Sequence, residues 1–84
     1  MAYSQADLEM AERHVAQGER HIREQVERIE WLRSAGLPIE EAEELLQLFH
    51  ATLAQHARHR DLIFEELRES IDGTRLRMVR DNHD

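Results

Sequence analysis

Apolar residues recur along the first half of the chain at alternating intervals of three and four positions. The series consists of Leu8, Ala11, Val15, Gly18, Ile22, Gln25, Ile29 and Leu32. This spacing keeps one stripe of an α-helix on the same side over several heptads, as in a coiled coil. The pattern predicts a first helix over about residues 4–35, with Ser4 as its N-cap and Asp7 three residues later.

The sequence Gly36-Leu37-Pro38 is expected to end this helix, and we predict a turn at residues 36–38. Glycine readily adopts the left-handed conformation that closes a helix, and proline does not continue one. The same spacing then resumes and predicts a second helix over about residues 39–72. Its stripe consists of Ile39, Ala42, Leu46, Phe49, Leu53, His56, Arg60, Ile63, Leu67 and Ser70.

Two heptad helices joined by a short turn predict an all-α antiparallel helical hairpin. When residues of the two helices are paired by their distance from the turn, small residues of the first helix face large residues of the second. Gly18 is then opposite His56, and Ala11 is opposite Ile63. The same pairing sets Gln25 near Phe49. A register shifted by one turn is also compatible with the sequence.

The hairpin is expected to be a single domain, residues 1–73. Gly73 is predicted to end the second helix, because glycine is common just past the end of a helix. Residues 74–84 are then expected to form a loosely ordered tail.

Such a thin hairpin leaves apolar side chains uncovered on either side of its stripes. These residues are Val26, Leu45, Ala57 and Phe64, with Trp31, Leu48 and Leu62 further round. Self-association would cover them, so we expect a homodimer that forms an antiparallel four-helix bundle.

Composition narrows the class of protein. Eighty-four residues allow one small domain, and a net charge of −7 argues against binding to duplex DNA, whose phosphates attract cations. Without cysteine the chain has neither disulfides nor thiolate metal ligands. The apolar runs are too short for a membrane span, and the first residues lack the pattern of a secretion signal, so a cytoplasmic protein is expected.

Histidine is the residue type here that most suggests chemistry. In the predicted register, the four candidate metal ligands His14, His21, His56 and His59 gather near Gly18. A structural role at the edge of the stripe is favoured, because the helices lack the Glu-x-x-His spacing of di-iron bundles. We therefore predict no metal site, no cofactor and no catalytic residue.

His56 and Arg60 occupy stripe positions where apolar residues are expected. A buried charge is costly unless it is paired. Glu12 or Glu19, from the same chain or from a partner chain, is therefore expected to pair with Arg60 and help to fix the register. The position of His56 also raises the hypothesis of a pH switch.

No catalytic arrangement is visible, since the chain has no glycine-rich phosphate loop, no cysteine, and no nucleophile beside a base. We expect a non-enzymatic interaction or regulatory protein that binds a second copy of itself. Whether it also binds a different protein is left open. One alternative is a metal-binding or pH-sensing bundle built on the histidines. A weaker alternative is an RNA-associated hairpin that uses the arginines of residues 74–84.

Several segments together resemble a known group of proteins. They are Ala-Glu-Arg-His-Val at 11–15, Gly-Glu-Arg-His-Ile at 18–22, the break at 36–38, the run at 41–46, and His-x-x-His-Arg-Asp at 56–61. Over roughly residues 8–69 the chain is similar to short proteobacterial two-helix proteins of unknown function. The resemblance implies a helical hairpin in a bacterial cell and implies no site.

Overall fold

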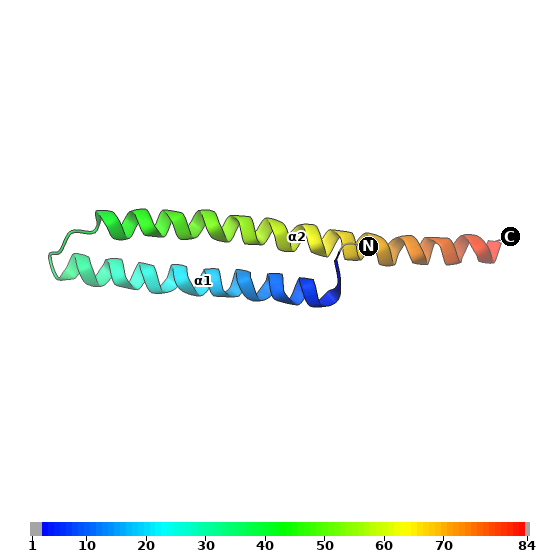
Figure 1. Ribbon diagram of the computed structural model, residues 1–84, viewed down its shortest axis with the longest axis horizontal. Coiled ribbons are helices and arrows are strands. Elements are labelled where there is room, and N and C mark those ends of the chain that lie inside the picture. The colour runs from blue at the N-terminus through cyan, green and yellow to red at the C-terminus, as the bar shows by residue number, and fades with distance from the viewer. Residues whose placement is uncertain (1–2, 84) are drawn as a thin grey trace.

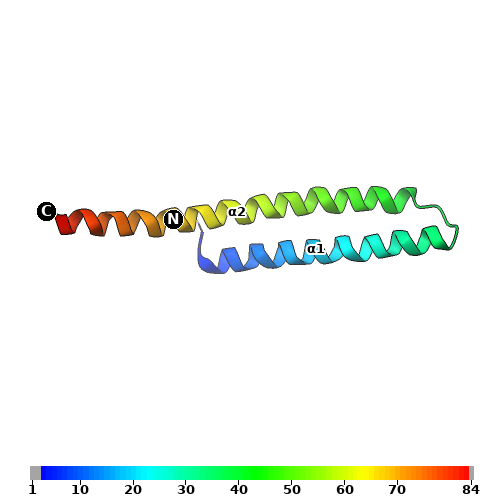
Figure 2. The ribbon, with the colours of Figure 1, turned by 180° about the vertical axis from the view of Figure 1, so that it is seen from behind.

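The computed structural model describes the backbone of residues 3–83 and the side chains of residues 3–70. Two helices, α1 (Gln5–Ser34) and α2 (Glu40–His83), lie side by side and run in opposite directions (Figure 1). The segment before α1 crosses toward α2, as the view from behind also shows (Figure 2). The predicted all-α antiparallel hairpin is confirmed.

The start of α1 is fixed by a capping box. The Ser4 hydroxyl accepts a hydrogen bond from the backbone N–H of Asp7 at 3.3 Å. In return, the Asp7 carboxylate accepts one from the backbone N–H of Ser4 at 2.8 Å. The two bonds satisfy backbone donors that a helix start leaves unpaired, and such a cap contributes about 1 kcal/mol. The predicted N-cap is confirmed.

The end of α1 is a Schellman motif centred on Gly36. Gly36 has a φ of +72°, and its N–H donates to the Arg33 carbonyl at 3.1 Å. The N–H of Leu37 donates to the Leu32 carbonyl at 2.9 Å. This pair of bonds defines the motif and confirms the role predicted for Gly36.

The two stripes predicted from the sequence meet along one interface, which we call the seam. Within residues 4–34, the eight stripe positions of α1 are the only ones that are not exposed. Among the described side chains of α2, the most buried is Ile63, which is 1% exposed and packs with Leu8 and Ala11. Tyr3 and Leu67 extend this cluster. The predicted pairing of Ala11 with Ile63 agrees with it.

Helix α2 continues past Gly73 to His83, beyond the predicted end at residue 72. One glycine inside a helix costs only about 1 kcal/mol relative to alanine, and good helix formers such as Arg75 and Leu76 follow it. The segment predicted to be a loosely ordered tail is therefore helical as far as His83; Asp84 lies outside the described residues. This part of α2 projects beyond α1 (Figure 1).

Replacing Gly36 by alanine is expected to destabilise the hairpin by about 1–2 kcal/mol, because a side chain disfavours positive φ. A Cβ at Gly36 meets nothing within 4 Å, so the cost is conformational rather than steric. Urea unfolding followed by circular dichroism measures it. The same change at Gly73, inside α2, is the control and is expected to raise helicity. An unchanged free energy of unfolding for Gly36→Ala would contradict this account of the turn.

Candidate functional site

The contact between Gly18 and Leu53 sets the register in the middle of the seam. A Cβ added at Gly18 would lie 3.1 Å from Cδ1 and 3.9 Å from Cα of Leu53. Leu53 therefore fills the space over Gly18 that the predicted register gave to His56. The prediction is wrong here by about one helical turn, and the shift is the one that the sequence left open.

This register distributes the candidate histidines over separate contacts. The rings of His14 and His56 have centroids 5.2 Å apart and planes inclined by 47°. His21 lies against Phe49, with centroids 5.7 Å apart, and His59 makes an edge contact with Tyr3 at 5.8 Å. The structure thus brings two of the four imidazoles together, and the predicted gathering of all four is wrong.

The spacing of the histidines explains why the four stay apart. His14 and His21 are seven residues apart, which separates their Cα atoms by about 10.5 Å along α1. One residue of α2 therefore reaches only one of them. Among the described residues, no group of three or more histidine, aspartate or glutamate side chains is placed to hold a metal ion.

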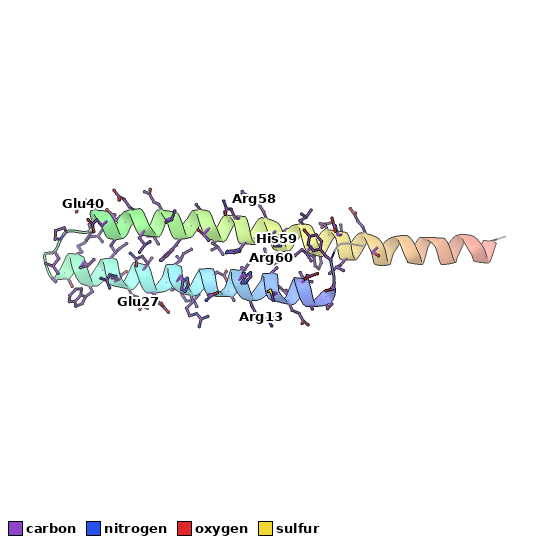
Figure 3. All side chains as sticks on the ribbon, in the orientation of Figure 1. Arg13, Glu27, Glu40, Arg58, His59 and Arg60 are labelled. Atoms are coloured by element: carbon purple, nitrogen blue, oxygen red, sulfur yellow. The ribbon has the colours of Figure 1, made fainter. Side chains whose placement is uncertain are left out.

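Arg60 does not pair with α1. Its Nε and one terminal nitrogen each lie 3.0 Å from Oδ1 of Asp61, the next residue in α2. The predicted pairing with Glu12 or Glu19 of the same chain is therefore wrong. The Arg60 side chain is 34% exposed, so water solvates much of its charge. A fully buried charge would instead have required an acidic partner on α1. Arg60 lies near the seam, whereas Arg13 and Arg58 point away from it (Figure 3).

Gln25 makes a polar contact across the seam that the sequence did not identify. It is only 6% exposed, and its side-chain N–H donates to the Ala42 carbonyl at 2.8 Å. The predicted neighbour was Phe49, which packs against His21 instead. A buried amide that bonds one backbone carbonyl favours a single register, because a shift would leave the amide unpaired.

One side of the hairpin, here called the open flank, carries hollows between the two helices. A hollow of about 370 Å³ near the turn is lined by Gln25, Arg28, Leu32, Pro38, Glu41, Ala42 and Leu45. The next one along shares Gln25 and Arg28 and includes His21 and Phe49. Another, at the far end, lies among Tyr3, Asp7, Met10, Ala11, His14, His59 and Ile63. The residues that line these hollows come from both helices and lie on the same side of the hairpin.

Exposed apolar residues cluster on or beside the open flank. Met10 and Leu45 line its hollows. The helical repeat places Trp31 of α1 and Leu48 and Leu62 of α2 on the same side. All five side chains are at least 40% exposed. The sequence identified four of them as apolar surface but missed Met10, because the surface emerges only when both helices are placed together.

Two of the serines, Ser4 and Ser34, have hydroxyls that form hydrogen bonds at the ends of α1. The Ser4 hydroxyl belongs to the capping box, and the Ser34 hydroxyl donates to the Trp31 carbonyl at 2.9 Å. Both are helix-end bonds, and the one at Ser4 is the N-cap predicted from the sequence.

The chain matches no protein-family model, no curated protein and no solved structure. The resemblance to proteobacterial two-helix proteins therefore stays a prediction. Within the described residues, neither helix has a stretch long and apolar enough to cross a membrane.

Two substitutions at Gln25 separate the volume of its side chain from its hydrogen bond. Gln25→Ala removes both and is expected to cost about 1–3 kcal/mol. Gln25→Met keeps the volume, so it is expected to cost less than Gln25→Ala and less than about 1.5 kcal/mol. Urea denaturation of both variants measures the difference. Equal losses would contradict this expectation and show that the bond to Ala42 carries the stabilisation.

Proposed function

We propose that this protein is a non-enzymatic helical interaction or regulatory protein that acts in the cytoplasm as a homodimer. The observation that carries the proposal is the exposed apolar surface of the open flank. Each hairpin would contribute two helices, and two hairpins joined through this flank would form an antiparallel four-helix bundle.

A single hairpin buries little apolar surface. Among the described residues, the buried apolar side chains are Leu8, Ala11, Val15, Ile29 and Ile63. On the open flank, Trp31 is 62% exposed and Leu48 is 61% exposed. Covering such residues removes apolar surface from water, which stabilises the complex by about 25 cal/mol for each Å² that is covered. A partner on this flank would therefore supply the core that one hairpin lacks.

A second copy of the chain suits this surface in an antiparallel arrangement. Residues 24–44, which surround the turn, hold seven acids and two arginines, a net charge of −5. Two copies aligned with their turns together would place these charges side by side. An antiparallel dimer separates the turns by about 45 Å, the length of a 30-residue helix. That distance exceeds the screening length of roughly 8 Å in physiological salt, so the repulsion becomes small.

The non-enzymatic part of the proposal has its own support. The Ser4 and Ser34 hydroxyls are engaged in helix-end bonds. The hollows of the open flank are half-open to solvent, whereas a pocket that buries a substrate encloses most of its surface.

Leu62 and Phe64 provide a matched test of which flank binds the second copy. Each is 51% exposed, and they lie about 200° apart around α2. Leu62→Glu, alone or with Leu48→Glu, is expected to convert a dimer into single chains, because it places a charge in the proposed interface. Phe64→Glu, on the other flank, is expected to leave the dimer intact. Light scattering after gel filtration reports the mass, and circular dichroism reports helicity.

Two results would contradict the proposal. A wild-type mass equal to one chain across micromolar to millimolar concentrations would rule out the homodimer. A dimer that Phe64→Glu dissociates and Leu62→Glu does not would place the interface on the opposite flank.

A further inference from the structure

The geometry points to His14 and His56 as a two-imidazole site for a first-row transition-metal ion such as Ni²⁺, Cu²⁺ or Zn²⁺. The site lies within one hairpin and joins α1 to α2. Both ligands come from the same chain, so the site does not need the proposed dimer, although His14 also lines a hollow of the open flank.

The separation of the two rings fits a shared ion. Imidazole nitrogens bind Zn²⁺ at about 2.0–2.1 Å, and two such rings at a tetrahedral angle have centroids about 5 Å apart. The centroids of His14 and His56 lie 5.2 Å apart. His21 and His59 instead contact Phe49 and Tyr3, whose rings do not replace an imidazole as a ligand.

The surroundings leave room for an ion and its water ligands. In the single hairpin His14 is exposed and His56 is half-buried, so solvent reaches the pair and water would complete the coordination shell. Arg60, one turn after His56 on α2, is paired with Asp61, which partly balances its charge. Two nitrogen ligands favour Ni²⁺, Cu²⁺ and Zn²⁺ over Mg²⁺ and Ca²⁺, which prefer oxygen.

Binding at this site would strengthen the hairpin. The two ligands are 42 positions apart in the sequence, so the unfolded chain does not hold them at the distance found in the fold. An ion that binds the folded chain in preference to the unfolded chain raises stability by mass action. The site would thus act as a metal-dependent clamp across the seam, close to the Gly18 contact.

The test uses the full chain, first treated with a chelator and then titrated with NiCl₂, ZnCl₂ or MgCl₂. We expect Ni²⁺ and Zn²⁺ to raise the thermal midpoint by several degrees and Mg²⁺ to leave it unchanged. Isothermal titration calorimetry should give one Ni²⁺ per chain. In the wild-type protein, small amounts of Cu²⁺ should broaden the ring proton signals of His14 and His56 before those of His50.

Single alanine variants locate the site. His14→Ala, at an exposed position that tolerates truncation, and His56→Ala are both expected to abolish the rise in midpoint. His50→Ala, an exposed histidine on the same helix as His56, should retain it, and so should His59→Ala. Loss of the response in His59→Ala with retention in His14→Ala would assign the ion to the His56 and His59 pair on α2 and overturn the inference. The absence of any nickel or zinc response, or one ion per two chains, would also overturn it.

Discussion

The close approach of Leu53 to Gly18 is the contact on which the arrangement of the hairpin depends. A Cβ at position 18 would lie 3.1 Å from the Leu53 methyl, so a side chain there would force Leu53 to shift by a few tenths of an ångström. With Leu53 in this place, His56 lies beside His14 and Phe49 beside His21. Gln25 then reaches the Ala42 carbonyl near the turn. The register is therefore held by one close steric contact and one buried hydrogen bond.

A fold with one seam has a functional consequence. Burial is concentrated in a single line of residues, and the open flank keeps apolar side chains such as Leu48 in solvent. In a larger domain a third helix would cover them; here a second copy of the chain is the proposed cover. The same seam brings together two imidazoles from different helices, and because His14 also lines the open flank, metal binding and self-association would use adjoining parts of one surface.

Local features were predictable from the sequence, and relations between distant residues were not. Ser4 and Gly36 set the ends of α1 through bonds within a few residues, so their roles were visible in the chain itself. The register was not, because a heptad repeat shifted by one turn still pairs apolar with apolar residues. The extent of α2 was missed because the penalty of one glycine is small, and the partner of Arg60 was missed because adjacent Asp61 is closer than any acid on α1.

The most direct test of the account is the register of the seam in solution. A ¹³C-edited nuclear Overhauser spectrum of the labelled chain, diluted into unlabelled chain, reports contacts within one molecule. The account predicts cross-peaks between the Gly18 α protons and the Leu53 methyl protons, because the two groups are in van der Waals contact. Cross-peaks from Gly18 to the His56 ring, with none to Leu53, would contradict it.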